Sequence, residues 1–157
     1  MDQDELYMSQ AIEQAQHGLA LGHGGPFGAV VVMRGEIIGR GWNQVVHLND
    51  PTAHAEMQAI RTACKHADNF HLSGAVLYTT CEPCPMCLSA AYWAHIGRLV
   101  YAAKAEDAAA SGFGDSSIAL EICKPMLDRE MPSRQVLRNE SLSLFEAWNI
   151  SDKRTEY

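Results

Sequence analysis

Apolar and polar positions alternate along the first third of the chain in two distinct ways. Residues 5–21 carry apolar side chains at near-helical spacing, which predicts an amphipathic helix that ends at Gly22. The segments 27–33 and 36–42 are short and mainly apolar, which is typical of buried strands, and Arg34-Gly35 lies between them. This arrangement predicts a β-hairpin directly after the first helix.

The middle of the chain predicts helices and strands in turn. Residues 43–51 are polar and predict a loop, and a helix follows from about 53 to 67, with Asp50 or Thr52 as its cap. Apolar residues 75–80 precede a cysteine cluster. Pro85 suits the first turn of a further helix that extends to about 95.

Shorter elements are expected in the last third: a parallel strand at 98–102, helices at 104–110 and 116–123, a weak strand at 135–138, and a terminal helix at 142–150. Strands and helices that alternate around one sheet predict an α/β fold, with the hairpin as its antiparallel side. No repeat, linker or low-complexity segment divides the sequence. We therefore expect a single domain over residues 1–157.

Composition narrows the classes of function. A chain of 157 residues that is 47% hydrophobic is large enough for one buried core. The formal net charge is −7, and no basic run is longer than Lys153-Arg154. Because nucleic-acid binding depends on a basic surface, we expect a small-molecule substrate and no nucleic-acid partner.

The cysteines and the N-terminus bear on the cellular compartment. The five cysteines are at positions 64, 81, 84, 87 and 123, an odd count, and three of them cluster at a proline-flanked motif. This pattern favours reduced thiols and metal binding over disulfides. Residues 1–5 are acidic and lack the features of a secretory signal, and no apolar run is long enough to span a bilayer. We expect a cytoplasmic protein that does not associate with membranes.

One set of residues has the composition of a metal site. His54 and Glu56 are two positions apart, and Cys84 and Cys87 follow in the segment Pro83-Cys84-Pro85-Met86-Cys87. One imidazole and two thiolates are ligands that Zn²⁺ prefers, and three protein ligands leave a fourth position open, as in catalytic zinc sites. Glu56 is a carboxylate that the ion does not need, which makes it a candidate general acid and base.

The start of a helix favours this arrangement. The partial positive charge at a helix N-terminus stabilises a thiolate at Cys84 or Cys87. Side chains two positions apart within a helix point in nearly opposite directions. His54 and Glu56 therefore face one pocket only if the helix is not yet regular at His54.

A closed structural zinc site is the alternative. Cys81 lies three residues before Cys84, and with His54 and Cys87 the two would form a Cys₃His set. That set leaves Glu56 without a role. Pro83 also restricts the preceding residue to extended geometry, which separates Cys81 from the helical pair.

With these motifs, the chain resembles the cytidine deaminase superfamily, whose members carry them on an α/β/α sandwich with a mixed sheet. Further segments are similar to the small bacterial guanine deaminases, and they cover nearly the whole chain except residues 124–139. These segments are residues 24–30, 49–56, 81–87, 92–94, 112–116, and the final Glu156-Tyr157. The resemblance implies one Zn²⁺ ion per chain and hydrolysis of guanine to xanthine and ammonia.

It also implies roles in binding a purine base. Asn43 would hydrogen-bond the purine, the Ala55 N–H would hold a ring carbonyl, and Phe27 and Trp93 would line or stack on the base. Asp115 would accept ring N–H protons and shuttle one. From the residues alone, Phe27 and Trp93 are equally candidates for core packing, Asn43 for a turn, and Asp115 for a helix cap.

The C-terminal segment is given a role by the resemblance only. Tyr157 would close the pocket, and residues 140–157 would be exchanged between the protomers of a homodimer. Without the resemblance, these last residues would be a solvated tail.

Other functions stay open at this point. Guanosine deamination is the nearest rival, because only the space around N9 separates nucleoside from base. Cytosine or tRNA adenosine deamination uses the same zinc chemistry, although the net charge of −7 disfavours a tRNA substrate. A non-catalytic binding module stabilised by zinc is a hypothesis of another class.

Overall fold

The computed structural model describes residues 2–157, which form two compact units, one ending at Ser116 and the other comprising Ser117–Tyr157. Met1, where the acidic N-terminus begins, lies outside the described residues. The expected single domain over residues 1–157 stays a prediction. No helix within residues 2–157 is long and apolar enough to cross a membrane.

The first unit is built on a mixed four-stranded sheet. Its strands, in the order β2-β1-β3-β4, are β2 (Glu36–Trp42), β1 (Gly28–Met33), β3 (Val76–Cys81) and β4 (Arg98–Ala103). β1 is antiparallel to both neighbours, and β4 is parallel to β3. The hairpin turn places Arg34 and Gly35 at positive φ angles of 52° and 83°, as a tight two-residue turn requires. The predicted hairpin and parallel strand are confirmed.

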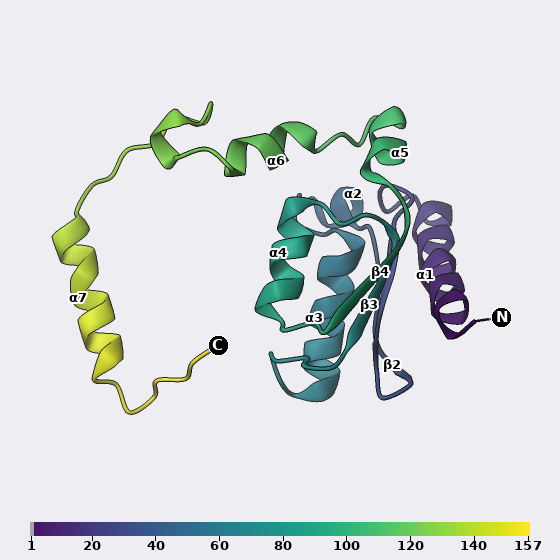
Figure 1. Ribbon diagram of the computed structural model, residues 1–157, viewed down its shortest axis with the longest axis horizontal. Coiled ribbons are helices and arrows are strands. Elements are labelled where there is room, and N and C mark those ends of the chain that lie inside the picture. Colours follow the sequence, from purple (N-terminus) through teal and green to yellow (C-terminus); the bar gives the residue numbers. More distant parts are fainter. Residues whose placement is uncertain (1) are drawn as a thin grey trace. The chain divides into compact units, whose positions relative to one another are not determined.

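Helices cover both faces of this sheet (Figure 1). α1 (Gln3–Ala20) lies on one face, and α3 (Ala55–Ala67) and α4 (Pro85–Trp93) lie on the other. Successive strand residues point to opposite faces, so Val30 packs in the cluster with α1 while Val31 packs in the cluster with α3 and α4. The expected three-layer α/β/α sandwich is confirmed.

Two glycines allow the helices to approach the sheet closely. A Cβ atom at Gly41 on β2 would lie 2.3 Å from the carbonyl oxygen of Ala55, and one at Gly28 on β1 would lie 2.1 Å from that of Ala11. Neither contact tolerates a side chain. Gly41 therefore sets the depth at which the first turn of α3 lies against the sheet.

The N-terminal end of α1 is fastened to the sheet by polar contacts. Tyr78 Oη–H on β3 donates to Asp4 Oδ1 at 2.8 Å, and Arg98 Nη1 on β4 donates to Asp4 Oδ2 at 2.9 Å. The hydrogen bond from Arg98 lowers the pKa of Asp4 from 3.8 to about 2, and that from Tyr78 adds to the effect. These contacts join three elements that lie far apart in the sequence.

Two expectations for residues 43–67 were wrong. The predicted loop contains a short helix, α2 (Val45–Leu48), and the next helix starts at Ala55 with His54 as its N-cap residue. Neither Asp50 nor Thr52 caps that helix. Asp50 Oδ1 instead accepts the Thr52 N–H at 2.8 Å, because a short Asp side chain bonds readily to backbone two residues ahead.

The last third is mostly helical, with the elements α5 (Ala105–Ala110), α6 (Ser116–Ile122), η1 (Met126–Asp128) and α7 (Arg138–Asn149). The strand predicted at 135–138 is wrong: Val136 and Leu137 are exposed, and Leu137 adopts a left-handed conformation before α7. A strand needs a hydrogen-bonding neighbour, which the short apolar sequence does not supply by itself. No residue of α6 or α7 is buried.

Candidate metal centre

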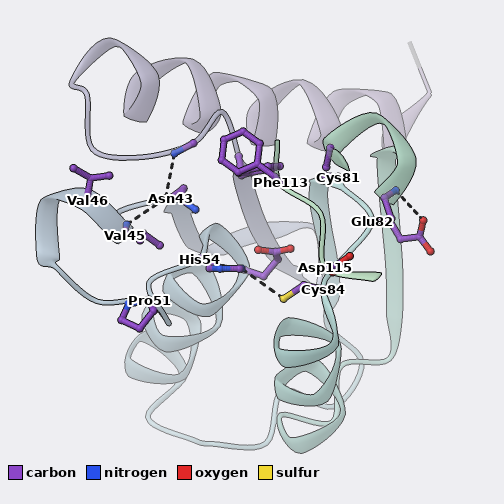
Figure 2. Close-up of a pocket in the computed structure, with 15 residues that line it drawn as sticks. Asn43, Val45, Val46, Pro51, His54, Cys81, Glu82, Cys84, Phe113 and Asp115 are labelled. Atoms are coloured by element: carbon purple, nitrogen blue, oxygen red, sulfur yellow. Dashed lines mark hydrogen bonds between the residues drawn. The ribbon is translucent and has the colours of Figure 1, made fainter. Parts of the chain in front are cut away.

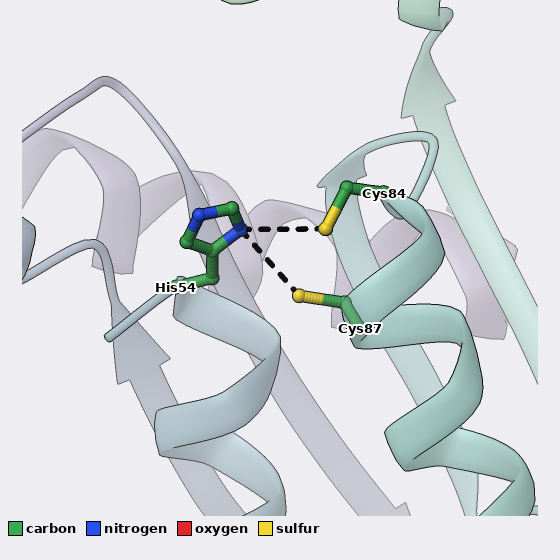
Figure 3. Close-up of side chains that lie close together, drawn as sticks. All are labelled: His54, Cys84 and Cys87. Carbon is green, nitrogen blue, oxygen red and sulfur yellow. Dashed lines mark hydrogen bonds between the residues drawn. The ribbon is translucent and has the colours of Figure 1, made fainter. Parts of the chain in front are cut away.

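Two helix N-termini position the three predicted metal ligands (Figure 3). His54 is the N-cap residue of α3, Cys84 is the N-cap residue of α4, and Cys87 lies in the first turn of α4. Both N-cap residues are extended, with ψ angles of 157° and 165°. The backbone leaves the helical path at these positions, so the side chains reach across the gap between the helices.

The spacing of the ligand atoms fits a tetrahedral zinc ion. His54 Nδ1 lies 3.6 Å from Cys84 Sγ and 3.6 Å from Cys87 Sγ. Bond lengths of about 2.05 Å to nitrogen and about 2.3 Å to sulfur, at a tetrahedral angle, place N and S about 3.6 Å apart. The donor set and its dimensions therefore suit Zn²⁺.

Among the three candidate ligands, Cys84 is the one whose thiolate form is stabilised by the other two. The hydrogen bond from Cys87 lowers the pKa of Cys84 from 9.0 to about 4, and His54 contributes to the lowering. The pKa of Cys87 is raised, because it donates to Cys84 and is buried. The hydrogen bond to Cys84 also raises the pKa of His54. A thiolate ligand is thus favoured at position 84.

Cys81 does not belong to the ligand group. Over residues 2–157, the only set of three or more potential ligands within 4.8 Å of one another is His54, Cys84 and Cys87. The Sγ–H of Cys81 instead donates to the Lys104 carbonyl oxygen at 3.5 Å. The geometry thus favours an open site with three protein ligands over the closed Cys₃His alternative.

Glu56 lies beside this site and is almost completely buried, at 6% exposure. It belongs to the first turn of α3, and it lines the same cavity as His54 because His54 still precedes the helix. The irregular start that the sequence required is therefore present. Burial raises the pKa of Glu56, so its carboxyl group can hold a proton nearer to neutral pH than an exposed glutamate does.

A cavity of about 310 Å³ opens beside the ligand group (Figure 2). Ligand sites in proteins usually start near this size. Of the residues predicted for substrate binding, Phe27, Asn43 and Asp115 line it. The sequence did not single out several other lining residues, among them Val45, Val46, Pro51, Glu82 and Phe113.

The side chain of Asn43 has a defined orientation. Its Oδ1 accepts the N–H of Gly25 at 3.3 Å and that of Val45 at 3.2 Å. Both partners are donors, so the oxygen must face them and the amide NH₂ group must point the other way. Because Asn43 lines the cavity and is only 7% exposed, it offers a hydrogen-bond donor at the cavity wall.

Phe113 forms an aromatic corner with Phe27. The two rings are 5.0 Å apart and nearly perpendicular, at 87°. Edge-to-face pairs of this kind are favourable contacts between rings. The sequence signal for Phe113 was its position between Gly112 and Gly114, but nothing local assigned it to a pocket.

Three other predicted residues are not among those that line the cavity. Trp93 is the last residue of α4, is 65% exposed, and is not among the residues that line the cavity. Ala55 is fully buried in the first turn of α3, where backbone N–H groups lack intrahelical acceptors. Tyr157 belongs to the second unit and is 73% exposed. Their roles in substrate binding stay predictions.

Known proteins are similar to this chain in both sequence and fold. Residues 1–103 match the family model for the cytidine and deoxycytidylate deaminase zinc-binding region. The chain is 50% identical to guanine deaminase of Bacillus subtilis over 153 residues, which cover 98% of each protein. The X-ray structure of guanine deaminase from Bacillus subtilis superimposes with a TM-score of 0.93 over 98% of both chains.

Other relatives match a smaller part of the chain. A tRNA-specific adenosine deaminase of Bacillus subtilis is 45% identical over 103 residues, which cover 66% of this chain and 63% of the relative. A guanine deaminase structure from Nitrosomonas europaea is 35% identical, with a TM-score of 0.66, and the match covers 69% of this chain and 63% of that one.

Proposed function

The chain belongs to the cytidine and deoxycytidylate deaminase zinc-binding family, and from this premise we propose that it hydrolyses guanine to xanthine and ammonia. The observation that carries the substrate assignment is the 50% identity to a guanine deaminase over 98% of both chains. The match to the tRNA-specific relative covers only 66% of the chain.

The reaction needs a water molecule activated at neutral pH. When held by His54, Cys84 and Cys87, zinc supplies a positive charge that lowers the pKa of such a water. Glu56 then takes one proton from the water, whose oxygen bonds to C2 of the purine, and passes that proton to the ring. The second proton of this oxygen passes through Glu56 to the amine, so that the C2–N bond breaks and ammonia leaves. Its raised pKa and its burial beside the metal ligands suit a group that must both accept and release protons.

The cavity walls carry hydrogen-bonding and apolar groups that suit a flat heteroaromatic base. The NH₂ group of Asn43 donates to a purine acceptor, and the Ala55 N–H holds a ring carbonyl. Phe27 and Phe113 form an apolar corner for the ring. Asp115 accepts ring N–H protons from the same cavity. The resemblance to the family assigns Trp93 to stacking on the base.

Guanosine is the closest alternative substrate, and an assay of ammonia release separates the candidates. Zinc-loaded protein should release ammonia from guanine much faster than from guanosine, cytosine, cytidine or adenosine. Faster release from guanosine would mean that the protein is a guanosine deaminase instead. No release from any of the five would favour the non-catalytic binding module.

We further propose that the protein is a homodimer in which residues 140–157 are exchanged. The second unit presents large apolar side chains without burying any residue of α6 or α7, and Phe145 and Ile150 are 63% and 88% exposed. The first unit presents apolar side chains on α4, where Leu88 and Tyr92 are 41% and 76% exposed. A second copy of the chain would cover both surfaces.

If the segments are exchanged, residues of two chains form each active site. An experiment that mixes two inactive variants can detect this. Glu56→Gln removes the general base from one protomer, and Tyr157→Ala removes the closing ring from the other. If Tyr157 of the partner subunit completes the site, mixing the two variants restores activity above that of either alone. A mixture no more active than the mean of its components would exclude exchange.

We also assign the protein to the cytoplasm. None of the five cysteines is in a disulfide; they are at positions 64, 81, 84, 87 and 123. Free thiols are typical of a reducing compartment.

A further inference from the structure

Two histidines outside the metal centre stack on one another beside the cavity wall. The rings of His23 and His47 are 3.9 Å apart and nearly parallel, at 8°. His23 follows α1, whereas His47 belongs to α2. The backbone completes the link, since the His23 carbonyl oxygen accepts the N–H groups of Val46 and His47 at 3.1 Å each.

This stack lies between the two segments that hold Asn43. The N–H donors to Asn43 Oδ1 belong to Gly25, two residues after His23, and to Val45, two residues before His47. The intervening loop packs tightly on the amide, since a Cβ atom at Gly24 would lie 2.0 Å from Asn43 Oδ1. A change in the spacing of the two histidines therefore moves the donors that orient Asn43.

A third contact fixes the protonation of His23. Trp42 Nε1–H donates to His23 Nδ1 at 3.1 Å. An indole nitrogen only donates, so His23 Nδ1 must carry a lone pair, and the neutral ring has its proton on Nε2. Protonation at Nδ1 would turn this hydrogen bond into a contact between two N–H groups.

The other groups that face His23 also disfavour its charged form. His47 is stacked on it, and His17 of α1 contacts the Trp42 ring edge-to-face at 4.8 Å. Burial lowers the pKa of His23, and the charges of His47 and His17 lower it further. The neutral stack is therefore the form that the fold stabilises, and acid opposes it.

We propose that His23 and His47 are positioning residues, whose stack holds the Asn43 amide in its substrate-binding orientation while His23 is neutral and releases it when His23 is protonated. The proposal rests on the function assigned above, since it gives Asn43 the guanine contact. Neither histidine lines the cavity, so both act on the substrate through Asn43. The expected consequence is that acid raises KM for guanine through this pair, separately from any effect on kcat.

Steady-state kinetics of the zinc-loaded protein between about pH 5 and pH 8 test this, since histidines titrate in that range. In the wild type, KM rises as the pH falls. His23→Asn keeps an acceptor near the Nδ1 position but cannot be protonated, so its KM should not depend on pH through this range. His23→Leu lacks the acceptor, so its KM should be about tenfold higher at every pH, the effect of losing about one hydrogen bond.

Two further variants sharpen the test. His47→Phe keeps a stacked ring without its charge, so the midpoint of the KM rise should move to higher pH. His66→Phe replaces an exposed histidine in the last turn of α3 and should keep the wild-type profile. The proposal is overturned if the wild-type KM is independent of pH, or if His23→Asn retains the acid rise.

Nuclear magnetic resonance separates this proposal from the assigned function. The Trp42 indole N–H and the backbone N–H groups of Gly25 and Val45 should titrate together in the wild type, and not in His23→Asn. If they titrate together but guanine is not hydrolysed, the assigned function fails and the coupling stands. If guanine is hydrolysed but the three signals titrate separately, the coupling is wrong.

Discussion

His54 Nδ1 lies 3.6 Å from Cys84 Sγ, although 30 positions separate the two residues in the chain. The distance equals the N···S edge of a tetrahedral zinc site, about 3.6 Å. Two helix starts on one face of the sheet produce it, so the metal site depends on how α3 and α4 are seated as well as on the ligands themselves.

The zinc content of two cysteine variants should differ sharply. Cys84→Ala removes a ligand and should lose stoichiometric zinc on dialysis, whereas Cys81→Ala should retain it, because Cys81 bonds to the Lys104 carbonyl instead. Atomic absorption of the purified variants measures both. Zinc loss from Cys81→Ala would instead support the alternative of a closed site with four protein ligands.

Glu56→Gln should retain zinc but lose turnover by a factor of about 10² to 10⁴, the usual contribution of a general acid–base group. The amide has the same shape as the carboxyl group but cannot accept a proton. Ammonia release and metal content are measured on the same sample.

Glu82→Gln is a matched comparison for that variant. Glu82 also lines the cavity, but its Oε2 accepts the Ala105 N–H at 3.2 Å. We expect a smaller loss of turnover. Equal losses in the two variants would remove the special role of Glu56.

Gly41→Ala should weaken both the fold and the metal site. The added Cβ atom would lie 2.3 Å from the Ala55 carbonyl oxygen and 2.5 Å from the Ala59 nitrogen, so α3 must shift. Overpacking of this kind costs about 1–3 kcal/mol in the free energy of unfolding. Zinc affinity should fall as well, because His54 precedes the displaced turn.

Gly97→Ala is the control for that substitution. Its nearest neighbour would be the Gly74 Cα atom at 3.4 Å, which is an ordinary contact. Thermal unfolding and zinc titration should show little change. If Gly41→Ala unfolded and bound zinc as this control does, α3 would not lie in close contact with Gly41.

Acid should destabilise the protein through Asp4. Its pKa is about 2 in the folded protein against 3.8 for the free side chain, so its ionised form is favoured by folding. The stabilisation is fully present above pH 3.8 and is lost as the pH falls through about 2. Denaturant unfolding at a series of pH values should show less acid dependence in this window for Asp4→Asn.

The control for Asp4 is a carboxylate in the exposed C-terminal segment. Asp152→Asn should keep the wild-type dependence on pH, since residue 152 lies outside the contact with Arg98 and Tyr78. An unaltered acid profile in Asp4→Asn would mean that the contact contributes nothing to stability.

The sequence predicted the metal centre well because its signals are local. Pro85 marks the start of α4, and the spacing of Cys84 and Cys87 places both thiols at that start. The hairpin was equally readable, since Arg34 and Gly35 occupy a two-residue turn. The hairpin pattern lies entirely in neighbouring residues, whereas the metal site adds His54, 30 positions before Cys84.

The cavity wall was harder to predict because distant segments form it. Phe113 meets Phe27 across more than eighty positions, a contact that no local pattern specifies. The strand expected at 135–138 failed for a related reason, since Val136 and Leu137 have β-like composition but no neighbouring strand. Composition indicates what a segment can form, and its neighbours decide whether it does.

The hydrogen bonds to Asn43 Oδ1 determine that this part of the cavity wall offers a hydrogen-bond donor. Two backbone donors occupy this oxygen, so the NH₂ group of Asn43 is left to donate into the cavity. An aspartate at this position would accept the same two N–H groups with one oxygen and present a lone pair with the other. Asn43→Asp therefore replaces this donor by an acceptor at nearly constant volume. If Asn43 binds guanine as proposed, position 43 is the place to redesign the enzyme for bases that carry a proton where guanine has an acceptor.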